Sequence, residues 1–222
     1  MLTLLDRHAI GHLLRTKGID AWGVAANSPR LPLAPEYPTA ISMLARLDPL
    51  VVRGLRRGPT EEYAREYFRL NAALDDASGT LVDVLRVQGH AAESVPATVG
   101  GAVNGDRLFP HKTAATSAGL GWIGKTALFV SHDFGPAVRL TTVFTDLALP
   151  PGEPVVEGRC GACRDCVDAC PAGCGRDVTW RAGMPREELF DAGACRHQMS
   201  LFPAVGAQVC GICIAACPYT RA

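Results

Sequence analysis

The run C-G-A-C-R-D-C-V-D-A-C-P occupies residues 160–171. Its cysteines Cys160, Cys163, Cys166 and Cys170 follow a C-x2-C-x2-C-x3-C spacing, and Pro171 comes directly after the last of them. A tight loop with this spacing points several thiols inward, and thiolates are soft ligands that suit zinc and iron–sulfur centres. Pro171 has no N–H and a fixed φ, so it can redirect the chain.

A second copy of the pattern, C-G-I-C-I-A-A-C-P, occupies residues 210–218. The symmetric first position of this copy is residue 207, which is Ala207, so the repeat lacks one ligand. Cys195 is the available substitute. This arrangement is typical of bacterial two-cluster ferredoxins, in which the fourth cysteine of each run binds the other [4Fe–4S] cluster.

The spacing therefore predicts two [4Fe–4S] clusters in a C-terminal ferredoxin-like region. We define the first thiol set as Cys160, Cys163, Cys166 and Cys217, and the second thiol set as Cys170, Cys195, Cys210 and Cys213. Cys174 is left over, and we interpret it as a small, partly buried thiol without a ligand role.

Two alternatives remain for these cysteines, namely two zinc sites and a set of disulfides. All nine cysteines of the chain lie between Cys160 and Cys217, whereas a disulfide scaffold usually spreads them along the chain. Zinc sites usually show two separated C-x2-C pairs and do not favour the C-x3-C-P ending. Both observations favour iron–sulfur clusters.

Composition restricts the class of protein. The 222 residues are 48% hydrophobic and 20% charged, which excludes a disordered chain and suffices for one sizeable core or two small ones. The formal net charge is zero, so no bulk field attracts a polyanion, although a local basic patch stays open. Neither a membrane helix nor a signal peptide is indicated, so we expect a cytoplasmic protein without membrane contact.

The residues before the cysteines predict an α/β (α+β) domain over 1–149, joined at Pro150 to the cluster domain over 150–222. Hydrophobic periodicity predicts helices from Thr3 (the N-cap) to about Lys17, from Thr60 to Gly89, and over 111–118. Short apolar runs predict strands over 19–25, 39–47 and 91–98, and two more after Lys125 around the turn at 132–136. The proline-rich residues 29–38 and the glycine-rich residues 99–110 are expected to be loops.

Residues 119–126, G-L-G-W-I-G-K-T, match two nucleotide-binding patterns. Both patterns require a strand before the glycines and a helix after them, because the helix N-terminus holds the phosphates. Here the expected order is reversed, which disfavours a nucleotide. Two interpretations remain: a tight helix-to-strand turn with Trp122 buried, or a bare backbone surface for a flat cofactor, with Lys112 and Lys125 on either side.

Taken together, H-K-T-A-A-T-S-A-G-L-G-W-I-G-K at 111–125, the V-F-T-D-L-A-L segment at 143–149 and both cysteine runs resemble the epoxyqueuosine reductase family. This resemblance implies a nitroreductase-like, mixed-sheet N-terminal domain that binds cobalamin, as in the related reductive dehalogenases. It also favours the ligand assignment that includes Cys195. The candidate corrinoid-binding residues are Gly119, Leu120, Gly121, Trp122, Gly124 and Lys125.

The chain differs from the tRNA-acting members of that family. Asp106 matches their acidic residue only after a one-residue slip, and His111 stands where they usually have Glu. The chain also ends at Ala222, before the C-terminal helical repeats of the longer members. These differences disfavour tRNA as the substrate but leave it open.

Candidate catalytic residues are few. Tyr67 lies on the apolar stripe of its helix with Tyr63, where a core role competes with proton donation. His111 and Lys112 are expected at a solvated helix start or in contact with a cofactor or substrate. The remaining histidines are interpreted as surface or capping residues: His8, His12, His90, His132 and His197. The basic run is interpreted as a solvated loop and contains Arg53, Arg56 and Arg57.

Three functions are consistent with these residues. The first is a reductase that passes electrons from the clusters to a corrinoid and reduces a small molecule or a protein. The second is an electron-transfer protein without substrate chemistry, and the third is epoxyqueuosine reduction on tRNA. A ferredoxin or flavodoxin is the expected electron donor.

Overall fold

The computed structural model describes residues 5–28, 36–98 and 109–220. They form two compact units that are not continuous in sequence. The first unit comprises residues 1–45, 70–120 and 139–155, and the second comprises 46–69, 121–138 and 156–222. The cysteine runs therefore lie in the same unit as residues 46–69 and 121–138, which precede the predicted boundary. The domain boundary at residue 149 stays a prediction.

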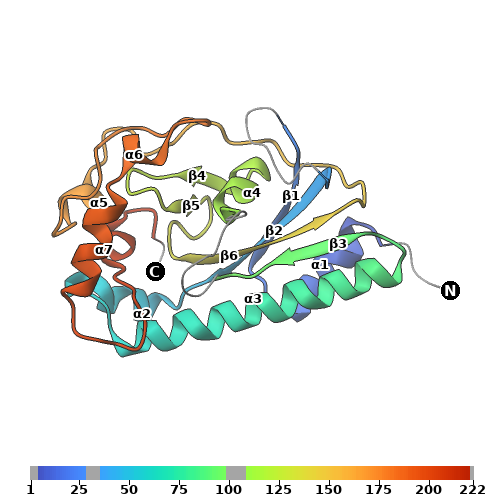
Figure 1. The fold of residues 1–222 in the computed structure, drawn as a ribbon, viewed down its shortest axis with the longest axis horizontal. Helices are drawn as coiled ribbons and strands as arrows, with labels where there is room; N and C mark the ends of the chain where they lie inside the picture. Colours follow the sequence, from blue (N-terminus) through green and yellow to red (C-terminus); the bar gives the residue numbers. More distant parts are fainter. Residues whose placement is uncertain (1–4, 29–35, 99–108, 221–222) are drawn as a thin grey trace. The chain divides into compact units, whose positions relative to one another are not determined.

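A four-stranded sheet organises the first unit (Figure 1). Its strand order is β1 (Ala21–Ala26), β2 (Thr39–Arg46), β6 (Val138–Thr145) and β3 (Ala92–Val95). β1 pairs with β2, and β3 with β6, both antiparallel. The first seven residues of β2 are buried, as expected for an inner strand rich in apolar side chains. The predicted strands over 19–25, 39–47 and 91–98 and the α/β (α+β) class are confirmed.

Helix α1 (Arg7–Thr16) opens the described part of the first unit. Its N-cap is Asp6, whose carboxylate accepts a hydrogen bond from the Ala9 backbone N–H at 2.8 Å. The predicted cap Thr3 lies outside the described residues. Gly18, at φ +75°, follows the helix, as the sequence predicts.

Helix α3 (Glu61–Val87) is the long helix at the bottom of Figure 1, next to β3. It begins after Thr60, whose hydroxyl accepts a hydrogen bond from the Tyr63 N–H, and Gly89 follows it at φ +88°. Within the first unit, the Asp75 carboxylate accepts from the Ala97 N–H, and Arg86 donates to the Ala92 carbonyl. These bonds attach the helix to the β3 segment.

Helix α4 (His111–Ser117) is terminated by a glycine in the left-handed conformation, as the sequence predicts. Gly119 has φ +77°, its N–H donates to the Thr116 carbonyl, and the Leu120 N–H donates to the Ala115 carbonyl. The buried face of α4 joins an apolar cluster with strand residues, made up of Ala25, Ala40, Ala114, Ala118 and Phe144.

The second unit contains short elements that the sequence did not predict. Residues 49–57, including the arginine run expected in a loop, form α2 (Pro49–Arg53) and the 3-10 helix η1 (Gly54–Arg57). Pro49 at the first helical position and Asp48 as N-cap explain this start. The cysteine-bearing region adds four helices: α5 (Asp165–Asp168), α6 (Arg186–Leu189), α7 (Ala192–Ser200) and α8 (Ile212–Ala216).

The glycine motif itself contains a strand, β4 (Gly121–Ile123), which pairs antiparallel with β5 (Phe129–Ser131). The predicted strands after Lys125 are thus real, but they belong to different sheets: β5 pairs with β4, and β6 lies in the four-stranded sheet. Gly121 permits the first pairing, because a Cβ there would lie 2.0 Å from the Val130 carbonyl oxygen.

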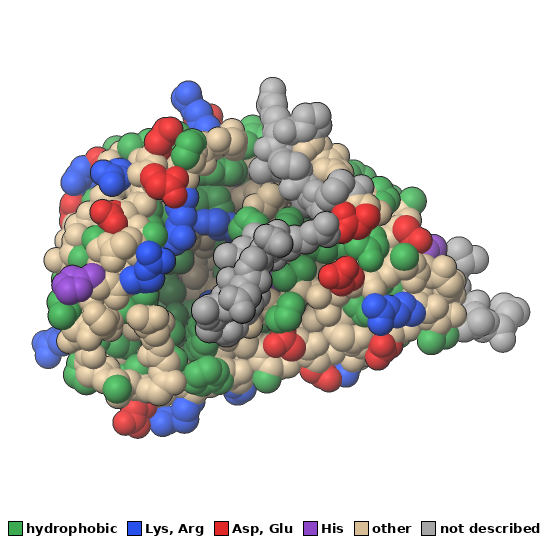
Figure 2. Space-filling view, viewed as in Figure 1, with side chains coloured by type: hydrophobic (Ala, Val, Ile, Leu, Met, Phe, Trp, Pro, Cys, Tyr) green, Lys and Arg blue, Asp and Glu red, His purple; other side chains and the backbone are tan. Residues whose placement is uncertain are grey.

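Charges of both signs are interspersed on the face shown in Figure 2. Within the described ranges, no helix has the length and apolar character needed to cross a membrane. The cytoplasmic location stays a prediction.

Candidate metal centre

The nine cysteines lie on short helices and loops of the second unit. Cys166 is in α5, Cys195 in α7 and Cys213 in α8, while the others lie in the connecting turns. All nine are free thiols in the described residues. Cys174 is buried and the other eight are partly exposed.

The first thiol set comes together from two distant parts of the sequence. Burial raises the pKa of the Cys166 thiol, and the thiols of Cys160 and Cys163 raise it further. Burial raises the pKa of Cys217 to about 12, and Cys166, Cys160 and Cys163 all add to that increase. Cys166 and Cys217 are therefore each close enough to the other predicted members of this set for their charges to interact.

The second thiol set also interacts internally. Burial is the main cause of the raised pKa values of Cys195, Cys210 and Cys213, and Cys170 contributes to all three. Cys195 belongs to this group even though it lies outside both C-x2-C runs. Its role as the ligand that the incomplete repeat lacks stays a prediction.

Cys174 lies nearer to the second thiol set than the sequence indicates. It is 1% exposed, and its pKa is raised to about 12 by burial first and then by hydrogen bonds and charges from Cys170 and Cys195. Five thiols therefore surround the second position. Cys195 remains the predicted ligand, and Cys174 the neighbouring thiol without a predicted ligand role.

The chemistry of this donor set fits iron–sulfur clusters. Deprotonating several neighbouring thiols at once is unfavourable without a compensating positive charge, and a bound metal supplies that charge. Soft thiolates are the ligands that such clusters use. In the part of the chain that the structure describes, no three His, Cys, Asp or Glu side chains are already arranged around the position of a single metal ion, so the two predicted thiol sets rest on the cysteine spacing and on the effects of the thiols on one another's pKa values.

Two aromatic residues near the first thiol set come from the glycine motif and from the segment after the second cysteine run. Trp122 is 2% exposed, and its indole Nε1–H donates to the Cys160 Sγ at 3.4 Å. Tyr219, just after the second cysteine run, meets the Trp122 ring edge-on at 5.0 Å between centroids. The Tyr219 hydroxyl donates to the Arg159 carbonyl at 3.0 Å, so it attaches the end of the chain to the residue before Cys160.

Thr126 contacts both thiol sets. Its side-chain hydroxyl is hydrogen-bonded to Cys166 of the first set and Cys213 of the second, which lowers the pKa of each against the larger, opposite effect of burial. Thr126 is 6% exposed. The sequence drew attention to this threonine only as part of a nucleotide pattern, and no signal pointed to its place between the thiols.

Lys125 forms an ion pair inside the second unit. Its side chain is 5% exposed, and its Nζ donates to the Asp177 Oδ1 at 2.7 Å. Arg164 also pairs with Asp177, and it reaches Asp168 at 3.1 Å. The hydrogen bond from Lys125, followed by the charge of Arg164, lowers the pKa of the Asp177 carboxyl. The ammonium group that a phosphate-binding loop would direct at its ligand is here neutralised by a carboxylate.

The glycines of the motif are required by close approaches within the chain. A Cβ at Gly119 would lie 2.5 Å from the Glu153 carbonyl oxygen, and one at Gly124 would lie 3.0 Å from a Val130 methyl group. Gly121 lies against β5, as described above. The buried-turn interpretation therefore accounts for these glycines, while their contact with a flat cofactor stays a prediction. Leu120, which is partly buried, packs within 3.1 Å of the Cβ position of Gly23.

The three candidate catalytic residues have different environments. Tyr67, in the second unit, is partly buried and meets Phe68 edge-on at 5.5 Å. Lys112 is partly buried in α4. His111 is held at both ring nitrogens, by the Thr142 hydroxyl at 3.0 Å and the Pro96 carbonyl at 2.9 Å. Asp106 lies outside the described residues.

His111 gives a pH prediction. Burial lowers its pKa, with a smaller contribution from Arg139, while the Pro96 carbonyl and Asp75 act in the opposite direction. Its folded pKa is thus below the ordinary value of 6.5, so its contribution to stability is complete above pH 6.5 and is lost as the pH falls through the folded pKa. We expect the free energy of unfolding to depend less on pH between 6.5 and 5 in His111→Gln, by at most about 1.4 kcal/mol per pH unit. Urea titrations at several pH values measure this. Exposed His12→Gln is the control, and equal slopes for His111→Gln and the wild type would contradict the prediction.

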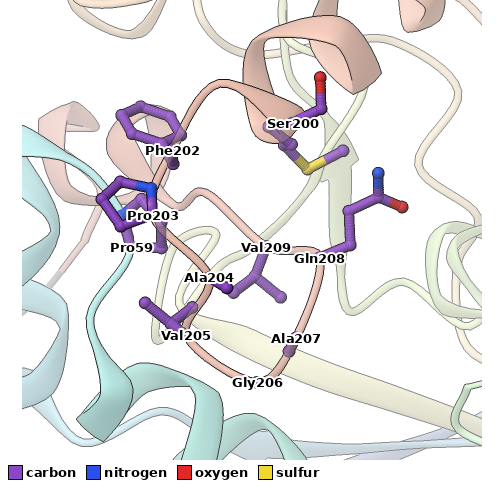
Figure 3. A pocket seen from close by; sticks show the side chains of 11 residues that line it. Pro59, Ser200, Phe202, Pro203, Ala204, Val205, Gly206, Ala207, Gln208 and Val209 are labelled. Carbon is purple, nitrogen blue, oxygen red and sulfur yellow. The ribbon is translucent and has the colours of Figure 1, made fainter.

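The segment between Cys195 and Cys210 forms an apolar pocket with a volume of about 400 Å³ (Figure 3). Phe202, Pro203, Val205 and Val209 line it together with Pro59. Ala207, which stands at the first position of the second cysteine run where a ligand is lacking, lies on the same loop.

Curated relatives match parts of the chain, although no family model matches it. A tetrachloroethene reductive dehalogenase from Sulfurospirillum multivorans is 32% identical over 119 residues, which cover 48% of this chain and 23% of the relative. An epoxyqueuosine reductase from Pseudomonas aeruginosa is 30% identical over 123 residues, which cover 50% of this chain and 32% of the relative. The aligned part therefore spans a third or less of each of these proteins.

Solved structures of the same two kinds share the fold. A reductive dehalogenase whose structure suggests a mechanism for B12-dependent dehalogenation aligns with all of this chain and 33% of its own, at a TM-score of 0.76 and 19% identity. The epoxyqueuosine reductase from Bacillus subtilis aligns with 97% of this chain and 65% of its own, at a TM-score of 0.65 and 16% identity. At these identities the likeness shows the fold alone.

Proposed function

This chain is related to the epoxyqueuosine reductases and the reductive dehalogenases, and on that basis we propose that it is an iron–sulfur oxidoreductase. Its two thiol sets bind two [4Fe–4S] clusters, which supply one electron at a time. The electrons pass to a corrinoid in the N-terminal part, and a small substrate is reduced. B12-dependent dehalogenation by a protein of the same fold supports the corrinoid.

One observation carries the proposal. Eight thiols from two cysteine runs and from Cys195 affect one another's pKa values largely within the two predicted sets, although Cys166 of the first set also acts on Cys213 of the second, and this pattern supports the exchange of ligands between runs that two-cluster motifs use. Burial and mutual charge keep these thiols protonated until a metal compensates them. Cluster binding would therefore release protons and stabilise the second unit.

The residues near the thiols can adjust the reduction potentials of the clusters, because these potentials depend on hydrogen bonds to the sulfurs and on nearby charge. Trp122 and Thr126 donate hydrogen bonds, Tyr219 fixes the end of the second run, and Asp177 neutralises the buried Lys125. A contact between the corrinoid and the glycine motif at residues 119–125 stays a prediction, because close approaches to other parts of the chain account for Gly119, Gly121 and Gly124 without it.

Anaerobic iron and sulfide analysis tests the clusters. We expect about eight iron and about eight sulfide per chain, with EPR signals of reduced [4Fe–4S] centres after dithionite. Zinc in place of iron, or a colourless protein prepared without oxygen, would contradict the proposal.

Hydroxocobalamin added to the same sample tests the corrinoid. A stoichiometric corrinoid spectrum retained through a desalting column supports the reductase. Retained clusters without a retained corrinoid would instead favour an electron-transfer protein that serves a partner. Restoration of queuosine in a tRNA assay would identify epoxyqueuosine reduction, and a ferredoxin or flavodoxin is the donor to include.

A further inference from the structure

The buried indole of Trp122 donates its N–H to a sulfur atom, which is an unusual acceptor. A buried indole N–H needs an acceptor, and most find an oxygen, since sulfur is a weak acceptor. In this protein the acceptor is the Sγ of Cys160, at 3.4 Å. A thiolate sulfur bound to iron carries more negative charge than a thiol, so the same contact becomes a charge-assisted hydrogen bond when a cluster is present.

The position of the indole ring is fixed on several sides. Tyr219 meets the ring edge-on, at an interplanar angle of 83°, and the His132 ring lies 5.4 Å away. β4 carries Trp122 and pairs it directly with Val130 of β5. Gly124, two residues on, brings the backbone close to the same thiol, since a Cβ there would lie 3.8 Å from the Cys160 Sγ. The donor is therefore held in place before any cluster binds.

We propose that Trp122 sets the reduction potential of the first cluster by donating its indole N–H to the Cys160 ligand. This inference rests on the proposed function. Reduction adds one electron to the cluster and moves no proton, because Trp122 keeps its N–H. The added electron increases the negative charge on the ligating sulfurs, so the hydrogen bond is stronger in the reduced state and raises the potential. Trp122 is thus a positioning residue that acts through Cys160.

Trp122→Phe removes the donor and retains an aromatic ring between Tyr219 and His132. A hydrogen bond to a charged group is stronger than one between neutral groups. At a fixed ambient potential we expect the ratio of reduced to oxidised first cluster to fall about tenfold, which corresponds to a shift of about −59 mV for a one-electron couple. The second cluster is expected to keep its potential.

Potentiometric EPR titration of the cluster-loaded protein measures both potentials. Trp180→Phe is the matched control, because Trp180 is also buried, at 7% exposure, in the same unit. A negative shift of one cluster in Trp122→Phe, with neither cluster shifted in Trp180→Phe, supports the proposal. Unchanged potentials at full iron content, or equal shifts of both clusters, would overturn it. A wild-type chain without iron would overturn the proposed function as well.

A second measurement does not need the Trp122→Phe variant. It tests the hydrogen bond even if Trp122→Phe does not assemble its clusters. Wild-type protein is labelled with indole-¹⁵N tryptophan, reduced, and studied by pulsed EPR. A ¹⁵N coupling to one cluster that persists in Trp180→Phe supports the hydrogen bond. A cluster-loaded sample without such a coupling would overturn it.

Discussion

Replacing Cys195 with alanine is expected to remove one of two [4Fe–4S] clusters, so that the spin integral of the reduced-cluster EPR signal falls by about half. Cys195 lies in α7, and its pKa is raised first by burial and then by Cys170 of the same thiol set. Removing one thiolate leaves the second set with an incomplete donor set. The first set is expected to remain loaded.

Cys174→Ala is the matched control for this experiment. Cys174 is the most buried of the nine thiols and lies beside both Cys170 and Cys195. The spacing of the sequence leaves it without a ligand role, so this variant is expected to retain both reduced-cluster signals. Iron analysis and EPR of the two variants, purified side by side without oxygen, make the comparison. A loss in Cys174→Ala with retention in Cys195→Ala would reverse the assignment.

The second large effect is expected at Gly121. A Cβ added there would lie 2.0 Å from the Val130 carbonyl oxygen and 2.8 Å from its carbonyl carbon. Both atoms belong to the backbone of β5, so the clash cannot be relieved by rotating a side chain, and β4 must move away from its partner. Overpacking of this kind costs about 3 kcal/mol or more of the free energy of unfolding.

Displacing β4 also displaces Trp122 and Thr126 from the thiols. We therefore expect Gly121→Ala to lose first-cluster iron as well as stability, as measured by anaerobic urea titration and iron analysis. Gly79→Ala is the control, because Gly79 lies in α3 with nothing within 4 Å of its Cβ position. That change is expected to stabilise the helix by about 0.5–1 kcal/mol. Equal stabilities for the two variants would contradict the steric explanation.

Much of the first unit is predictable from local pattern. The α3 helix follows from apolar residues at helical spacing after Thr60, and β2 follows from a continuous apolar run. Gly119 is predictable as a helix terminator because only glycine adopts φ +77° without strain. In these cases the residues that determine an element lie within it, so a short window of sequence suffices.

The second unit is harder to predict because its elements are short and depend on distant partners. β4 has three residues, too few for a recognisable alternation, and it forms only because β5 pairs with it. The basic run at Arg53, Arg56 and Arg57 gives no helical signal of its own, yet η1 packs against α8. Asp177 likewise gives no signal as the partner of Lys125.

The cysteine spacing by itself predicts the metal chemistry, since the intervals between the thiols determine which ligands one loop can supply. It also indicated that one ligand had to come from elsewhere. Only the tertiary structure decided which residues surround those thiols: Trp122 on Cys160, Thr126 between the two sets, and Cys174 beside Cys195. The physical reason is that ligand spacing is local along the chain, whereas hydrogen bonds and burial around the sulfurs depend on segments that meet only after folding.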